Sequence, residues 1–120
     1  MKPIRLLLIC ALCALVASGC ATLDEKQRLW IFQPSDRSWG NTATQAEGMD
    51  EVWIDFASRV TGEPARLHGL WLPSERPNAP VLLYLHGARW NVAGSAFRMR
   101  RMHELGFSVL GIDYRGFGKS

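Results

Sequence analysis

The sequence predicts an α/β domain that follows an export signal. Two short apolar runs carry the fold prediction, Val81–Leu85 and residues 107–112, with a helical segment between them. The first run is opened by Pro80 and closed by Gly87, which is typical of a strand buried on both faces. Such strands need helices on both sides of the sheet. The order strand, helix, strand therefore predicts a right-handed crossover in a parallel sheet.

Residues 1–19 are expected to form a signal peptide. Two basic residues precede an apolar run of 12 residues, 6–17, which is shorter than the about 20 residues that span a bilayer. Small residues then lead to Cys20, which resembles the lipobox of bacterial lipoproteins, although Ala17 stands where leucine is more usual. The resemblance implies export, cleavage before Cys20, lipidation of its thiol and anchoring in a bacterial cell membrane. Which membrane carries the anchor is left open, with the outer membrane or the periplasmic face as the options. An ordinary signal peptide with an incidental cysteine is the alternative.

Removal of the signal changes the composition that matters for function. The other two cysteines, Cys10 and Cys13, lie within it, so an acylated Cys20 leaves no thiol for a disulfide or a metal. The mature chain has 12 basic and 11 acidic residues, because two of the 14 basic residues leave with the signal. This balance gives no reason to expect a nucleic-acid partner. No pattern predicts a cofactor or a metal site.

The segment before the first run is predicted to be a tether followed by a hairpin. Residues 20–28 are polar and expected to form the tether, residues 28–32 a short strand stopped by Pro34, and residues 35–50 a surface loop. Residues 51–57 alternate apolar and polar side chains, which predicts a half-buried strand. A turn at residues 61–64 leads to a return strand at residues 66–72.

A helix is predicted after residues 91–94, with Ser95 as its N-cap and Gly106 as its terminator. Phe97, Met102 and Leu105 are expected on its inward side. The helix also carries three arginines, and a solvated face is the preferred interpretation over an acidic partner. These arginines are Arg98, Arg100 and Arg101.

Two motifs at strand ends resemble a known family. His86-Gly87 is followed by Asn91, and the last strand ends in Asp-Tyr-Arg-Gly-Phe-Gly-Lys-Ser, residues 113–120. In this order and spacing they resemble the front half of an α/β-hydrolase, and most closely the BEM46-like and ABHD-like (serine aminopeptidase-like) serine hydrolases. The resemblance covers residues 29–120. It implies the N-terminal, incomplete part of an α/β-hydrolase fold, with an antiparallel hairpin leading into a parallel sheet flanked by helices.

The resemblance also implies roles for these residues. The backbone N–H of Ala88 is expected to be one oxyanion-hole donor, which stabilises the tetrahedral intermediate by about 3–4 kcal/mol. His86 is expected to order the loop and not to act as the general base, and Arg89 and Trp90 to lie at the mouth of the crevice. Asp113 and Arg115 are expected to fix the last turn as a charged pair. The full set of loop supports is His86, Gly87, Asn91, Asp113, Arg115, Gly116 and Gly118.

The end of the sequence does not match a phosphate-binding loop. Gly-Lys-Ser at residues 118–120 resembles such a loop, but Asp113 stands where that motif needs glycine.

Other parts of a hydrolase are not found in the sequence. No Gly-x-Ser-x-Gly elbow occurs, so nucleophile, acid and base are all missing. We therefore expect the front portion of an exported serine hydrolase that acts on a small-molecule acyl substrate, inactive by itself. The alternative is a non-catalytic lipoprotein or a degenerate remnant. The strand that carries the nucleophile would pair beside Val81–Leu85, so that edge is expected to be open.

Overall fold

A computed structural model describes residues 2–37 and 40–120, and these form two compact units, Met1–Gln33 and Pro34–Ser120. The first unit contains one helix, α1 (Lys2–Phe32), whose described side chains are exposed. Its length and composition would allow residues Pro3–Phe32 to cross a membrane, and signal sequences near an N-terminus meet the same criterion. The helix is therefore compatible with either a signal or a membrane anchor.

The prediction of a strand at residues 28–32 is wrong, and the predicted tether at residues 20–28 is helical. Both segments belong to α1. Residues 21–32 contain neither proline nor glycine, and Arg28 Nε lies 3.3 Å from the carboxylate of Asp24 one turn earlier, a spacing that supports a helix. The helix ends before Gln33, whose φ of 46° is left-handed and which precedes Pro34.

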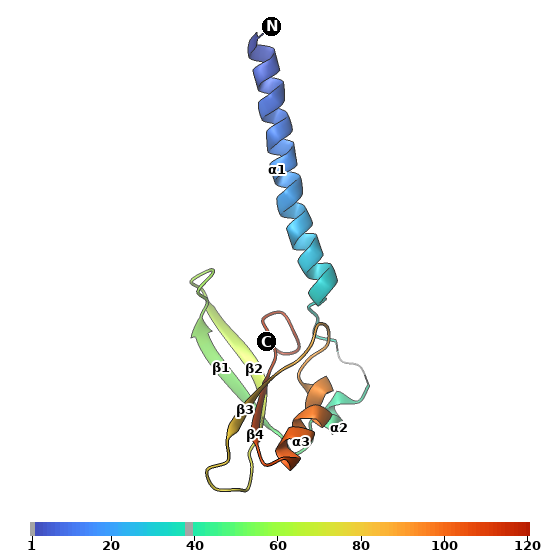
Figure 1. The fold of residues 1–120 in the computed structure, drawn as a ribbon, viewed down its shortest axis with the longest axis vertical. Coiled ribbons are helices and arrows are strands. Elements are labelled where there is room, and N and C mark those ends of the chain that lie inside the picture. Colours follow the sequence, from blue (N-terminus) through green and yellow to red (C-terminus); the bar gives the residue numbers. More distant parts are fainter. Residues whose placement is uncertain (1, 38–39) are drawn as a thin grey trace. The chain divides into compact units, whose positions relative to one another are not determined.

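Within the described residues of the second unit, four strands form one mixed sheet in the order β1-β2-β4-β3 (Figure 1). The strands are β1 (Asp50–Ala57), β2 (Pro64–Leu72), β3 (Val81–Leu85) and β4 (Ser108–Ile112). The predicted hairpin is confirmed, since β1 and β2 are antiparallel. The predicted parallel pair is confirmed as well, because β3 pairs in parallel with β4. β2 pairs antiparallel with β4, so the hairpin joins the parallel pair through the last strand.

Strand β3 lies at the edge of this sheet, as expected, but it is not buried on both faces. Val81, Leu83 and Leu85 are 66%, 55% and 53% exposed, whereas Leu82 and Tyr84 pack on the core. The apolar run thus has one face that packs on the core and one face that is exposed. The edge combines unpaired backbone groups with exposed leucines, a combination that favours association.

This edge predicts that residues 20–120 alone are marginally stable and associate through β3. Replacing Leu83 by lysine is expected to reduce association, because a charge on an edge strand disfavours pairing with another chain. Sedimentation velocity over a range of concentrations measures the effect, with a lysine at another exposed leucine outside the sheet, Leu105→Lys, as the control. A wild-type chain that stays monomeric and unfolds cooperatively would contradict the prediction.

The core lies between the sheet and the helix α3 (Ala96–Glu104), which follows a short 3-10 turn, η1 (Ala93–Ser95). The buried cluster at its centre contains four apolar side chains, which come from β2, from β4, from α3 and from the loop before η1. They are Leu70, Val92, Met99 and Val109. Gly111 of β4 allows the close approach of α3: a Cβ there would lie 2.7 Å from Met99 Sδ and 2.6 Å from Val92 Cγ2.

The predicted inward face of this helix is wrong in two of three positions. Ala96 and Met99 are buried, while Phe97 is 53% and Leu105 68% exposed. Met102 is partly buried against the core, as expected. Ser95 occupies the N-cap position without a side-chain capping bond, and Gly106 ends the helix with a φ of 100°.

The remaining elements differ from the predictions in smaller ways. The loop predicted at residues 35–50 contains a one-turn helix, α2 (Thr42–Gln45), and two of its residues, 38 and 39, lie outside the described residues. Strand β1 is present but is not half-buried, since Ile54 and Phe56 are 38% and 37% exposed. The hairpin therefore extends away from the core over much of its length.

Candidate functional site

The loop that follows β3 is held in place by the ring of His86. This side chain is buried, and its Nδ1 lies 2.8 Å from the carbonyl oxygen of Gly87. Tyr114 donates a hydrogen bond of 2.8 Å to the His86 carbonyl, and its ring lies 4.5 Å from the imidazole. Phe117 packs edge-on against the same imidazole. His86 thus joins the loop after β3 to the turn after β4.

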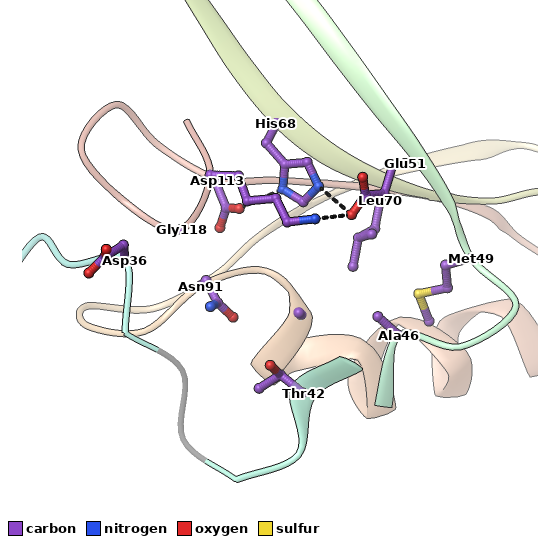
Figure 2. A pocket seen from close by; sticks show the side chains of 12 residues that line it. Asp36, Thr42, Ala46, Met49, Glu51, His68, Leu70, Asn91, Asp113 and Gly118 are labelled. Carbon is purple, nitrogen blue, oxygen red and sulfur yellow. Dashed lines mark hydrogen bonds and ion pairs between the residues drawn. The ribbon is translucent and has the colours of Figure 1, made fainter. Parts of the chain in front are cut away.

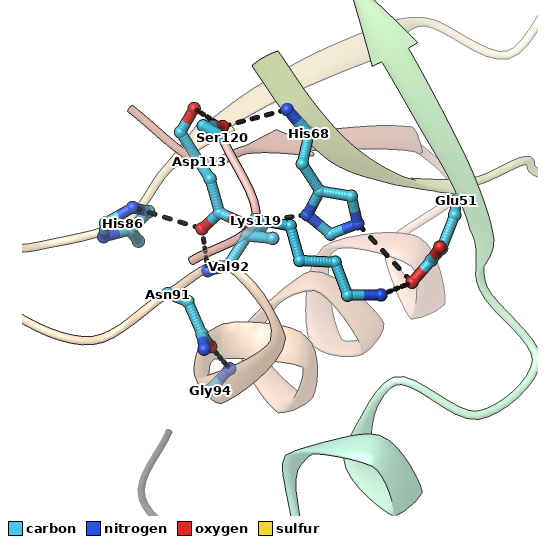
Figure 3. Close-up of polar contacts among 9 residues, drawn as sticks. All are labelled: Glu51, His68, His86, Asn91, Val92, Gly94, Asp113, Lys119 and Ser120. Atoms are coloured by element: carbon cyan, nitrogen blue, oxygen red, sulfur yellow. Dashed lines mark hydrogen bonds and ion pairs between the residues drawn. The ribbon is translucent and has the colours of Figure 1, made fainter. Parts of the chain in front are cut away.

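Asp113 binds the same loop from the end of β4 (Figure 3). The carboxylate is 1% exposed and accepts a hydrogen bond of 2.6 Å from the N–H of Val92. Its Oδ1 also lies 3.6 Å from His86 Nε2. Asn91 bends the following residues, because its Oδ1 accepts a hydrogen bond from the Gly94 N–H at 3.0 Å. The structure therefore brings together His86, Asn91 and Asp113, as the sequence motifs suggested.

The turn after Asp113 differs from the predicted arrangement in one respect. Within the described residues, Arg115 forms no ion pair with Asp113; its guanidinium instead donates to the hydroxyl of Ser58 at 2.9 Å. The charged pair expected to fix the turn is therefore not formed, because the guanidinium reaches the end of β1. Gly116 and Gly118 have φ values of 80° and 50°, and a Cβ at Gly118 would collide with the Asp113 carboxylate. Both glycines are thus required by the bend.

His68 is the main residue that sequence reasoning missed (Figure 3). Its ring is buried, and Nδ1 lies 2.8 Å from Asp113 Oδ2, so Nδ1 carries a proton that it donates to this carboxylate. Its Nε2 lies 3.6 Å from the Glu51 carboxylate. Ser120 closes the cluster: its hydroxyl accepts from the His68 N–H and donates to the Asp113 carbonyl, both at 2.9 Å.

Lys119 forms an ion pair with Glu51 at the surface of this cluster. Its ammonium group lowers the pKa of the Glu51 carboxyl, and His68 contributes in the same direction. A lowered folded pKa means that the pair stabilises the fold above the usual pKa of glutamate and loses its effect as the pH falls through the lowered value. The carboxylate is half exposed, so solvent screens the interaction.

Two cavities flank the loop, and Asn91 lines both of them. The first, of about 420 Å³, lies over His68, Asp113 and Lys119, with Ala46 and Met49 on its apolar side (Figure 2). The second, of about 520 Å³, is lined by the loop itself and by the start of α3. Ala88 lines this second cavity, which we call the loop cavity.

The loop cavity adjoins a strained stretch of backbone. Arg89 and Trp90 are consecutive residues with φ values of 66° and 64°, in the left-handed region that non-glycine residues seldom adopt. Both side chains line the loop cavity, as does that of Arg98 from α3. Within the described residues, no hydrogen bond engages the N–H of the preceding Ala88. A backbone donor is therefore available beside this cavity.

The described residues do not contain a serine nucleophile paired with a base. No serine hydroxyl among them is hydrogen-bonded to a histidine ring, and the Ser120 hydroxyl is engaged by two backbone groups. His103 lies apart, with Nε2 3.0 Å from the Pro73 carbonyl. No group of three or more potential ligands in residues 2–37 and 40–120 is arranged to hold a metal ion. Cys20 lies exposed on α1, in the other unit.

Known proteins similar to this chain include one uncharacterized relative and one solved structure. No protein-family model matches the chain. The uncharacterized protein MT2364 of Mycobacterium tuberculosis (strain CDC 1551 / Oshkosh) is 31% identical over an alignment of 120 positions, which covers 98% of this chain and 41% of that protein. A crystal structure of a probable hydrolytic enzyme (PA3053) from Pseudomonas aeruginosa PAO1 is similar with a TM-score of 0.51 and 23% identity, over 70% of this chain and 27% of the other. The sheet and helices are compatible with part of an α/β fold.

The chain is thus similar in fold to part of that crystal structure, and it spans less than half the length of either protein. The similarity supports the predicted fold class at this coarse level. Asp113 and His86 join the loop after β3 to the turn after β4, and these two segments position the site. This arrangement can present a backbone donor and two arginine side chains to a ligand in the loop cavity.

Proposed function

We propose that the chain is the front portion of an exported, lipid-anchored serine hydrolase of the BEM46-like and ABHD-like group. It would cleave an ester, thioester or amide of a small-molecule acyl substrate through an acyl-enzyme. The observation that carries the proposal is the N–H of Ala88 beside the loop cavity, which no hydrogen bond engages among the described residues, in a loop held by Asp113. In the α/β-hydrolase fold, one of the two oxyanion donors comes from the loop after an early strand of the sheet.

The anchoring part of the proposal depends on the first unit. Cys20 is exposed on α1, it follows small residues, and the apolar run before it is compatible with a signal. Two or more acyl chains on this residue would give stable membrane binding. Incorporation of labelled palmitate that Cys20→Ser abolishes would support the anchor, and unchanged labelling in that variant would contradict it.

The decisive experiment removes the proposed oxyanion donor in the full-length protein that the gene encodes. Ala88→Pro deletes the N–H and is expected to lower kcat for a neutral ester by about 10²–10³-fold, while Ala88→Gly keeps the N–H and stays near the wild type. Labelling by a fluorophosphonate probe reports the nucleophile independently of any substrate. The 120-residue chain alone is expected to show neither labelling nor esterase activity.

Two outcomes would overturn the enzyme proposal. A full-length protein that no fluorophosphonate labels would lack an activated serine. Equal activity of the folded Ala88→Pro and Ala88→Gly variants, checked by thermal unfolding, would remove Ala88 from the mechanism. The first result would favour a non-catalytic lipoprotein.

A further inference from the structure

The loop cavity carries positive charge without a compensating carboxylate. Two of its lining residues are arginines, Arg89 from the loop and Arg98 from the first turn of α3, and no aspartate or glutamate lines it. Among the described residues, no carboxylate pairs with either guanidinium. Arginine presents several N–H donors in a planar fork that matches carboxylate and phosphate oxygens. The lining therefore suits an anionic group.

The three arginines of α3 have different roles. Arg100 donates to the backbone carbonyls of Gln45 and Glu47, and Arg101 pairs with Glu104 at 3.4 Å on the exposed side of the helix. Arg98 instead stacks on the ring of Phe97, with its guanidinium carbon 4.4 Å from the ring centroid. This stacking holds the cation in place and leaves its N–H groups able to bind a ligand. Of the three, only Arg98 lines the loop cavity.

Arg89 reaches the cavity through an unusual backbone conformation. It and Trp90 form the left-handed pair described above, at a free-energy cost of the order of 1–3 kcal/mol per strained residue. Glycine would adopt these angles without strain, yet the sequence has a cation and an aromatic ring here. Strained residues of this kind are concentrated at active sites and ligand clamps. The strain is a second observation that points to a ligand at the place where the positive charge lies.

From this lining we infer that the acyl substrate is negatively charged, and that Arg89 and Arg98 bind its anionic group while the carbonyl lies near Ala88. The inference rests on the proposed function, because Ala88 lines the same cavity. The substrate class is therefore an ester, thioester or amide that bears a carboxylate or phosphate close to the bond that is cleaved. Neutral esters would enter the cavity without this contact and bind more weakly.

Binding to the full-length protein, recorded before the probe is hydrolysed, tests the inference through an affinity and not through a rate. Monomethyl succinate supplies the anion and dimethyl succinate is its neutral match, with the indole N–H signal of Trp90, assigned from Trp90→Phe, as the NMR reporter. Arg98→Gln and Arg89→Gln are each expected to raise the Kd for monomethyl succinate by roughly fivefold to tenfold. Arg101→Gln, on the same helix and outside the cavity, is the matched control and should leave the Kd unchanged. Added salt should weaken binding of the anion alone.

Each outcome supports or overturns the inference separately from the proposed function. Equal affinity for the two succinate esters, or an equal loss in Arg101→Gln and Arg98→Gln, would overturn the anion site. Arg98 is exposed, so its variant keeps the test valid even if Arg89→Gln fails to fold. A protein that prefers the anion but is not labelled by a fluorophosphonate keeps the site and loses the hydrolase proposal. A protein that is labelled by a fluorophosphonate but binds the two esters equally loses the anion site and keeps the hydrolase proposal.

Discussion

Replacing Asp113 by alanine is expected to lower the free energy of unfolding of the full-length protein by about 3–5 kcal/mol. The carboxylate is almost fully buried and accepts short hydrogen bonds from His68 Nδ1 and from the Val92 N–H. Removing it leaves two buried donors without an acceptor, and each such loss costs about 1–3 kcal/mol. The loop after β3 also loses its attachment to the end of β4.

Urea unfolding followed by tryptophan fluorescence measures this effect. The matched control is Asp55→Ala, which removes a carboxylate that is 76% exposed and pairs with Arg66. Exposed pairs of this kind contribute about 0–1 kcal/mol, so the control should unfold close to the wild-type midpoint. Similar unfolding midpoints for the Asp113 and Asp55 variants would show that the buried cluster does not hold the fold together.

Replacing Met99 by alanine is expected to destabilise the protein by about 2–5 kcal/mol. The side chain is completely buried and its sulfur packs over Gly111, where the sheet has no side chain of its own. Truncation would leave a cavity between α3 and β4 that the neighbouring Val92 and Val109 can fill only in part. The loss combines the lost transfer of apolar groups from water with the cost of this cavity.

Thermal unfolding of the Met99→Ala and Leu105→Ala variants measures this loss of stability. It compares a buried side chain with an exposed side chain of the same helical segment. Leu105 is 68% exposed, so its truncation should change the free energy of unfolding by less than about 0.5 kcal/mol. A larger loss of unfolding free energy in Leu105→Ala than in Met99→Ala would contradict the packing of Met99 against β4. It would favour the helix face that the sequence predicts.

The strands could be predicted from the sequence because their signals are local. Alternation in the hairpin and short apolar runs with proline or glycine at their ends gave β1 to β4 with small errors at the ends. The inward face of α3 could not be predicted, because the helical segment carries apolar side chains on more than one side and its sequence does not show which side packs on the sheet. The five residues 28–32 show the other limit: so short an apolar run does not distinguish a strand from a helix.

The site was predictable as two motifs but not as a network. His86, Asn91 and Asp113 follow strand ends, and parallel strands bring their carboxyl ends together, so their proximity could be expected. His68 is 45 residues from Asp113 in the sequence. Its place follows only from the antiparallel pairing of β2 with β4, which sets Gly69 opposite Ile112 and so His68 beside Asp113. The order of strands in the sheet was the missing information.

The pairing of β2 with β4 also constrains when these strands can form one sheet during synthesis. The contacts that close the cluster join residues 45, 52 and 68 positions apart, and all of them use residues 113–120. A ribosome that adds about 5–20 residues per second needs about 2–9 s to make the 45 residues from His68 to Asp113. Throughout that interval β2 has only β1 as a partner, and an isolated two-stranded hairpin is at best marginally stable in water. Until the turn after β4 has been made, the nascent chain therefore lacks the contacts that lock β2 into the sheet.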